Sequence, residues 1–229
     1  MRSNILGYLV EASPLAVCID TMTQSLQDDR RDCRWMACLN PHSYAVARRD
    51  PAFSAALKAS DWLVPDGVGV VIASRLLNHP IPARITGFDV FDGIMQALEV
   101  RGGSVFFLGS TEDVLQNIRK KLALDYPNVR LVGAFSPPFR SQFTAEDSAA
   151  MISVVRETRP DVLWVGMTAP KQEKWLDEHS DQLPVNFAGA VGAVFDFYTG
   201  KVRRSHPIFR KLGLEWLPRL LQEPQRLWR

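Results

Sequence analysis

Short apolar runs alternate with longer amphipathic stretches along this chain. The apolar runs predict strands over residues 35–40, 62–64, 104–109, 129–135, 161–167 and 185–191. The amphipathic stretches predict helices over residues 43–58, 67–77, 111–123, 144–158 and 170–182, with Ser43 as the N-cap of the first. Strands that alternate with helices are typical of an α/β fold, and we expect a Rossmann-like, mostly parallel sheet flanked by helices.

The residues that follow the predicted strands are the first candidates for function, because ligands bind beyond the carboxyl ends of parallel strands. These positions hold small, polar or turn-forming residues, which suit a nucleotide site: Asn40, Asp66, Gly109, Ser110, Thr111, Thr168, Lys171, Gln172 and residues 192–196, the last of which is Asp196. The chain contains neither GxGxxG nor GxxxxGK[ST]. The turn at Gly109 and Ser110 is therefore better interpreted as an ordinary strand-to-helix turn than as a phosphate-binding one.

Asp66 stands between the apolar run 62–64 and a turn that contains Gly67 and Gly69. A helix cap and a catalytic base are both consistent with this position. Apolar surroundings raise the pKa of a carboxyl group, and a general base works best when its pKa lies near the working pH. The two glycines would let the backbone approach a ligand closely.

Three further polar residues each allow two interpretations. Asn40 either starts a helix or contacts a ligand. Arg84 either holds a diphosphate through paired hydrogen bonds or forms an ion pair with Asp89, which is itself a candidate helix cap. Lys171 lies at a predicted helix start, either near a bound anion or in solvent.

The composition is that of a globular protein. The chain has 229 residues, of which 46% are hydrophobic and 23% are charged. Cys18, Cys33 and Cys38 match no disulfide framework and no metal-binding spacing, so we expect reduced thiols in a cytoplasmic protein. No run approaches the roughly 20 apolar residues of a membrane span, and Glu11 and Pro14 interrupt the N-terminal apolar segment, which argues against a signal peptide.

Positive charge is concentrated at the C-terminus. The whole chain carries +2, but residues 201–229 hold eight basic and two acidic residues, so this segment carries +6 and residues 1–200 carry −4. We expect an α/β domain over residues 1–200 and a basic, amphipathic appendage of short helices over residues 201–229.

The appendage mixes Leu and Trp with basic residues, which suits the surface of an anionic membrane. We expect these residues to contact that surface: Arg210, Lys211, Trp216, Arg219, Arg226 and Arg229. The alternative is a tail packed on its own domain, with arginine stems covering apolar surface. A nucleic-acid partner is disfavoured because the tail is rich in Leu and Trp and adjoins an acidic body.

Seven stretches of the chain form a specific combination of motifs. They are LNPHSYAVA, VPDGVGVV, RITGFDVF, VFFLGS, VGMTAPKQEKWL, GVGAVFDFYTGKVRRSHP and LGLEWLPRLLQEPQRLWR. Taken together and in this order, they resemble the WecG/TagA/CpsF family of bacterial glycosyltransferases, and the resemblance spans the chain from about residue 10 to its end.

This resemblance implies an inverting transfer that needs no metal and no cofactor. The donor would be a UDP-sugar, often UDP-N-acetylmannosamine or its uronic acid. The acceptor would be a sugar linked to undecaprenyl diphosphate at the inner face of the cytoplasmic membrane. The protein would then be peripheral to that membrane, and whether copies form a homo-oligomer stays open.

The resemblance also assigns roles to residues. Asp66, in the DG.G turn, matches the family's general base, and Asn40 and Gln172 match other positions of its catalytic site. Arg84 would steady the donor diphosphate. The full set that we expect to bind substrate is Arg84, Thr86, Gly109, Ser110, Lys171 and Asp196.

Two departures from the family pattern motivate a second interpretation. Cys38 stands where the family usually has a threonine hydroxyl, and Met167 to Ala169 replace the usual residues before KQE. A thiol is a poor substitute for a hydroxyl as a hydrogen-bonding group. The alternative is therefore a non-catalytic subunit that binds a nucleotide sugar and acts as a scaffold in a polysaccharide assembly complex.

Overall fold

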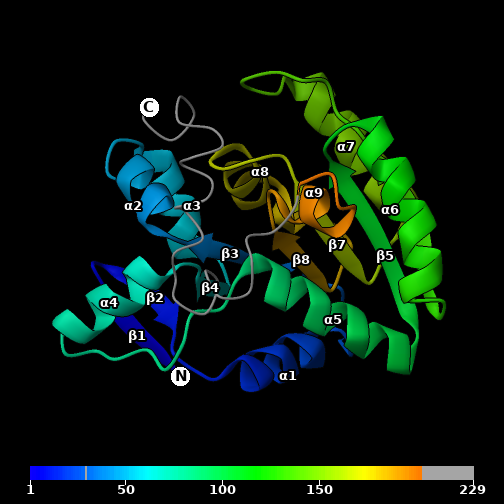
Figure 1. Cartoon of the computed structure of the whole chain (residues 1–229). Helices are drawn as coiled ribbons and strands as arrows, with labels where there is room; N and C mark the ends of the chain where they lie inside the picture. Colours follow the sequence, from blue (N-terminus) through cyan, green and yellow to red (C-terminus); the bar gives the residue numbers. More distant parts are fainter. Residues whose placement is uncertain (29, 203–229) are drawn as a thin grey trace.

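The computed structural model describes residues 1–28 and 30–202, and a six-stranded sheet lies at its centre (Figure 1). The strands pair in the order β4-β3-β8-β7-β5-β6, and every pair is parallel. Their bounds are β3 Arg34–Leu39, β4 Trp62–Pro65, β5 Gly103–Gly109, β6 Val129–Phe135, β7 Val162–Gly166 and β8 Phe187–Ala190. The predicted α/β fold with a mostly parallel sheet is confirmed.

A small hairpin precedes the sheet, and the hydrophobic pattern did not predict it. Strands β1 Arg2–Ile5 and β2 Tyr8–Glu11 pair antiparallel, and β2 lies against β4 at the edge of the main sheet. The turn residues Leu6 and Gly7 both have positive φ, at 53° and 86°. A turn with two positive φ angles is usually formed by Asn-Gly or Asp-Gly. In the Leu-Gly pair only the glycine matches this preference, so the sequence indicates the turn weakly.

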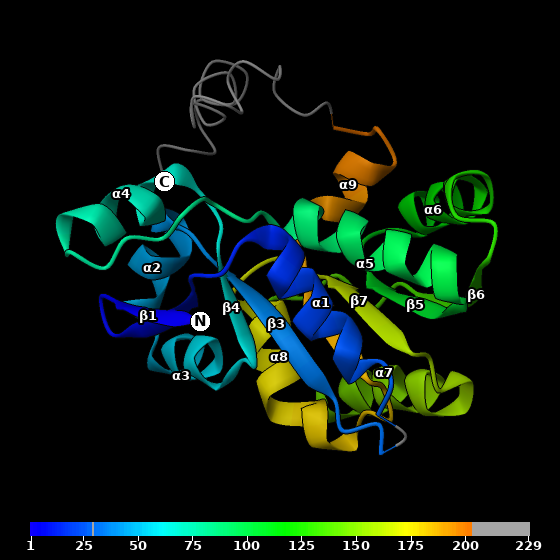
Figure 2. The same cartoon turned by 90° about the horizontal axis from the view of Figure 1, so that it is seen from below.

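Helices cover both faces of the sheet (Figure 2). One face packs against α2 Pro41–Ala47, α3 Pro51–Ala59, α7 Ala145–Thr158 and α8 Lys171–His179. The other face packs against α1 Leu15–Ser25, α5 Gly87–Arg101, α6 Glu112–Asp125 and α9 Val194–Tyr198. Helix α4 Val68–Leu76 follows β4, and the 3₁₀ helix η1 Ser180–Gln182 follows α8.

The central strands are buried on both faces, which explains their continuous apolar sequence. In β7, Leu163 and Val165 enter the core beneath α7 and α8, whereas Val162 and Trp164 enter the core beneath α5 and α9. Successive side chains of a strand point to opposite faces, so a strand between two helical layers needs apolar residues at every position.

The helix predicted over residues 43–58 is two helices in the structure. Helix α2 ends at Ala47, and α3 begins at Pro51 after its N-cap, Asp50. Proline disfavours the α conformation in the residue before it, and it is well accommodated at the first position of a helix. The prediction that Ser43 is the N-cap was also wrong, because Asn40 holds that position.

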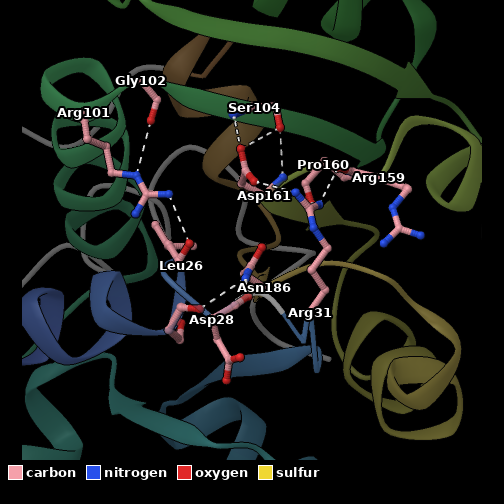
Figure 3. A network of polar contacts seen from close by, with 11 residues as sticks. Leu26, Asp28, Arg31, Arg101, Gly102, Ser104, Arg159, Pro160, Asp161 and Asn186 are labelled. Carbon is pink, nitrogen blue, oxygen red and sulfur yellow. Dashed lines mark hydrogen bonds and ion pairs between the residues drawn. The ribbon is translucent and has the colours of Figure 1, made fainter.

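Polar contacts join the amino ends of three central strands (Figure 3). The Asp161 carboxylate accepts hydrogen bonds from the Ser104 backbone N–H at 2.7 Å and from its hydroxyl at 2.8 Å, and it pairs with Arg31 at 3.0 Å. The Asp161 carbonyl accepts the backbone N–H groups of Asn186 and Phe187. This network lies at the edge of the sheet opposite the carboxyl ends of the strands, so its role is structural.

We predict that Asp161→Ala destabilises the fold without affecting ligand binding. The substitution leaves Arg31 and Ser104 without their shared acceptor, which costs about 2 kcal/mol for a half-buried pair of this kind. The melting temperature should fall by roughly 4–8 °C for a domain of this size. The exposed residue Asp32 supplies the control, since Asp32→Ala should leave melting unchanged. A melting temperature for Asp161→Ala within 1 °C of the wild type would contradict this assignment.

Candidate functional site

A cavity of about 430 Å³ opens at the carboxyl ends of β3, β4, β7 and β8. Four of the residues predicted to form the site lie on its wall: Asn40, Asp66, Thr86 and Gln172. Cys38, His42 and Glu173 also line it. The sheet therefore brings together side chains that are far apart in the sequence, at the edge where the α/β pattern predicts a ligand.

A larger hollow of about 650 Å³ lies between α7 and α8, lined by Arg156, Glu157 and Glu178 among others. It contains none of the residues predicted to form the site. It also lies away from the carboxyl ends of the strands, so the smaller cavity is the better candidate for a ligand site.

Asn40 fixes the start of α2 at the cavity wall. Its side-chain oxygen accepts a hydrogen bond from the Ser43 backbone N–H at 2.8 Å. The Ser43 hydroxyl in return accepts the Asn40 backbone N–H at 2.8 Å, which completes a capping box. Of the two interpretations of Asn40, the helix start is confirmed, and the residue also faces the cavity.

Asp66 lies directly after β4 and is half-buried on the cavity wall. Its backbone N–H donates to the Leu39 carbonyl at 2.8 Å, which ties the end of β4 to the end of β3. The N-cap of α4 is Gly67, with a φ of 117°, so the cap interpretation of Asp66 was wrong. The backbone at Gly69 lies close to Pro41 of the protein itself, since a Cβ at this glycine would lie 2.6 Å from Pro41 Cγ.

Thr86 and Asp89 form a second capping box at the start of α5. The Thr86 hydroxyl accepts the Asp89 backbone N–H at 3.1 Å, and the Asp89 carboxylate accepts the Thr86 backbone N–H at 2.9 Å. Thr86 is thus the cap, and Asp89 is its partner three residues on. This box brings Gly87 against Cys38, whose sulfur would lie 3.3 Å from a Cβ at that glycine.

The Cys38 thiol is held in its neutral form. Burial raises its pKa well above the usual value, and the nearby carboxyl groups of Asp66 and Glu173 raise it further. Because the thiolate is the reactive species, Cys38 is poorly suited to act as a nucleophile at neutral pH.

The Gln172 side chain joins the ends of two strands. Its Oε1 accepts the backbone N–H of Met167, just after β7, at 3.1 Å, and that of Gly192, just after β8, at 3.2 Å. Its Nε2 donates to Glu173 Oε1 at 2.9 Å. Gln172 is only 3% exposed, so these contacts hold the floor of the cavity together.

Glu173 is the wall residue that the sequence did not single out. It lies in the first turn of α8, where a carboxylate is commonly explained by the helix dipole. In the structure it is 2% exposed, and burial raises its pKa to about 7, opposed in part by the hydrogen bond from Gln172. The available sequence signal for a role of Glu173 was its position in the KQE motif, directly after Gln172.

Five residues predicted to bind substrate lie outside the cavity wall: Arg84, Gly109, Ser110, Lys171 and Asp196. Gly109 ends β5, and the backbone N–H of the next residue, Ser110, donates to the Gly166 carbonyl at 3.0 Å. Arg84 is half-buried in the segment before α5, and Asp196 is half-buried on α9.

The Lys171 side chain points toward the loop between β6 and α7. Its Nζ donates to the Arg140 carbonyl at 2.8 Å and lies 4.6 Å from the centre of the Phe143 ring. Partial burial lowers the pKa of Lys171. In this arrangement its charge is engaged by the loop rather than by the cavity.

The described part of the cavity wall contains two acidic residues. Among the described residues that line it, Asp66 and Glu173 are carboxylic acids, and none is Lys or Arg. Within residues 1–28 and 30–202, no cluster of three or more His, Cys, Asp or Glu side chains is placed to hold a metal ion.

The six residues predicted to contact a membrane, from Arg210 to Arg229, lie outside the described residues. No helix in the described part of the chain is long and apolar enough to span a membrane.

The parallel sheet and the polar cavity at its carboxyl edge define an α/β protein with a candidate ligand site at that edge. The chain belongs to the glycosyl transferase WecG/TagA/CpsF family, whose model matches residues 3–229. It is a glycosyltransferase by this membership, and the resemblance inferred from the motifs is confirmed.

Three curated relatives carry the same name, N-acetylglucosaminyldiphosphoundecaprenol N-acetyl-beta-D-mannosaminyltransferase. The relative from Bacillus spizizenii strain W23 is 28% identical over 88% of this chain and 76% of its own length. The one from Bacillus subtilis strain 168 is 29% identical over 83% of this chain and 72% of its own length. The one from Staphylococcus aureus strain MW2 is 27% identical over 100% of this chain and 87% of its own length.

We predict that Gln172→Met destabilises the cavity floor. Methionine has a similar length but cannot accept the two backbone N–H groups, and unpaired buried donors cost about 2 kcal/mol in total. The melting temperature should fall by roughly 4–8 °C. Gln96→Met on the exposed face of α5 is the control and should melt like the wild type. Unchanged melting of Gln172→Met would show that these two contacts contribute little to the fold.

Proposed function

We propose that this protein transfers N-acetylmannosamine, its uronic acid or a related hexose from a UDP-sugar to a sugar linked to a polyprenyl diphosphate. The transfer inverts the configuration at the sugar and uses no metal. The relatives' shared name supports the acceptor class and the transferred sugar. The product would serve the synthesis of cell-surface polysaccharide.

The observation that carries this proposal is the position of Asp66. Its side chain lines the cavity at the carboxyl edge of the sheet, beside Cys38 and Asn40. An inverting transfer needs one base and no covalent sugar–enzyme intermediate. A single carboxylate on the wall of a substrate-sized cavity meets that requirement.

In the proposed reaction, Asp66 removes the proton of the acceptor hydroxyl while that oxygen attacks C1 of the donor sugar. The bond between C1 and the diphosphate oxygen breaks, and UDP leaves with the bonding electrons. The proton ends on the Asp66 carboxylate, and one glycosidic bond replaces one sugar–phosphate bond. The roles of Asn40 and Gln172 in this scheme are to shape the wall around the reacting groups.

Charge that develops on the leaving diphosphate requires donors and cations. The N-terminus of α5 presents Gly87 at the cavity wall and can provide backbone N–H groups. Arg84, three residues earlier, is our candidate for the cation. Gly109, Ser110, Lys171 and Asp196 remain candidates for more distant parts of the donor.

We predict that Asp66→Asn lowers kcat at least 100-fold while the Kd for the UDP-sugar stays within about threefold. Loss of a general base costs about 10²–10⁴ in rate, and the amide keeps the size of the side chain. Turnover is measured as UDP release with a polyprenyl-diphosphate-linked N-acetylglucosamine acceptor. Asp113→Asn, exposed on α6, is the matched control and should keep full activity. Turnover by Asp66→Asn within tenfold of the wild type would remove Asp66 from the mechanism.

The proposed acceptor is a lipid, so the protein must work at a membrane surface. We place it at the inner face of the cytoplasmic membrane as a peripheral protein. The basic residues of the segment 201–229 are the proposed contact with anionic headgroups.

We predict that replacing Arg219, Arg226 and Arg229 by Ala weakens binding to anionic vesicles roughly 100-fold. Each basic residue near an anionic surface contributes about 1 kcal/mol, and 1.4 kcal/mol corresponds to tenfold. Sedimentation with phosphatidylglycerol vesicles measures the binding. The control replaces Arg119, Lys120 and Arg130, which are exposed on and beside α6. Equal losses in the two triple variants, or equal binding to neutral vesicles, would refute the assignment to this segment.

A further inference from the structure

Glu173 is a buried acid that the proposed reaction does not use. Glu173 is 2% exposed, yet it lines the same cavity as Asp66 and Cys38. Long acidic side chains are rarely buried to this degree unless they are paired. Glu173 therefore calls for a physical explanation.

One of its two oxygens is explained by the fold. Glu173 Oε1 accepts the hydrogen bond from Gln172 Nε2 at 2.9 Å. The Gln172 Oε1 atom is in turn fixed by the backbone N–H groups of Met167 and Gly192. This chain of contacts fixes the carboxyl group relative to the ends of β7 and β8.

The second oxygen is not explained. Among the described residues, Glu173 Oε2 is fully buried and has no hydrogen-bond partner. Buried polar atoms are normally paired, and an exception at a cavity wall points to a ligand that completes the pairing. A fixed carboxyl group with one unpaired oxygen is suited to bind a hydroxyl or an amide N–H.

The surroundings make a neutral or weakly acidic sugar group a better partner than a phosphate. Asp66 lines the same cavity, and both acids act electrostatically on the Cys38 thiol, so both lie near it. His42 is the other titratable residue of the described wall. Carboxylates repel a diphosphate, whereas a sugar hydroxyl can donate to a carboxylate or accept from a protonated carboxyl group, and an amide N–H can donate to a carboxylate.

We propose that Glu173 binds the transferred sugar, with Oε2 paired to a hydroxyl or to the amide N–H of its N-acetyl group. This inference rests on the proposed function, since it assigns a contact within the same donor site. It makes Glu173 a specificity-determining residue beside the base. It also explains why the carboxyl group is buried although the fold pairs only Oε1 and leaves Oε2 without a partner.

The test compares binding of UDP-N-acetylmannosamine with binding of UDP by calorimetry, using the full chain. In Glu173→Met, which removes both oxygens, the Kd for the UDP-sugar should rise about tenfold or more, and the Kd for UDP should change less than twofold. In Glu173→Gln, the new side-chain oxygen accepts from Gln172 and the NH2 group faces the ligand, so the Kd for the UDP-sugar should stay within about threefold if the partner is a hydroxyl and should rise about tenfold or more if the partner is the amide N–H. Glu178→Met, on the exposed face of the same helix, is the control.

Glu173→Asp covers the case in which the methionine variant fails to fold. It keeps the carboxyl group but withdraws it by one C–C bond, about 1.5 Å, and should weaken binding of the UDP-sugar at least threefold without weakening that of UDP. Wild-type affinity in the aspartate or the methionine variant would overturn the inference. An equal loss of UDP affinity would also overturn it, because the contact would then be with the nucleotide or with the fold.

The same measurement separates this inference from the proposed function. Binding of the UDP-sugar needs no acceptor and no turnover, so failure of the transfer assay with the wild type would refute only the proposed reaction. A wild-type protein that binds the UDP-sugar no tighter than UDP would refute the sugar contact, whatever its turnover.

Discussion

The contact that the site depends on is the hydrogen bonding of one buried amide. Gln172 accepts two backbone N–H groups, one beyond β7 and one beyond β8, and it donates to the neighbouring Glu173. The same side chain thus closes the ends of two strands and fixes the only acid on the cavity floor that belongs to α8. A residue so fully engaged by the protein has no second acceptor role to offer a substrate. Under the proposed function, we therefore expect Gln172 to shape the wall rather than to accept a hydrogen bond from the substrate.

The positions after the predicted strands gave a useful but incomplete site. Asn40, Asp66 and Gln172 reach the cavity because β3, β4 and β7, which they follow, end at one part of the sheet edge around β8, and Thr86 reaches it from the start of α5. Gly109 is the last residue of β5, which lies beyond β7, and it does not reach the wall. Local periodicity predicts that a strand exists, but strand order depends on how distant segments pair. The sequence could therefore predict that the site lies at the carboxyl edge of the sheet, but it could not predict which strands along that edge surround the site.

The features missed from the sequence share a physical cause. The burial of Glu173 comes from the packing of α8 against the ends of other strands, whereas the local pattern shows only an acid near a helix start. Pro51 ends one helical pattern and starts another, although the apolar spacing runs across it. The hairpin before α1 forms at a Leu-Gly turn, which is a weak local signal. Each feature is decided by tertiary contacts or by one backbone constraint, and neither is visible in a hydrophobic period.

The acidic wall constrains how a UDP-sugar can lie in this protein under the proposed function. A carboxylate suits the acceptor hydroxyl that must lose its proton, but it repels a diphosphate at close range. Asp66 and Glu173 both line the cavity, and none of the described residues that line it is Lys or Arg. We therefore expect the sugar to lie toward the two acids and the diphosphate to lie toward the start of α5, where backbone N–H groups are available and Arg84 is close in the chain. This orientation places the bond to be broken between a base on one side and cationic stabilisation on the other, which is the arrangement an inverting displacement requires.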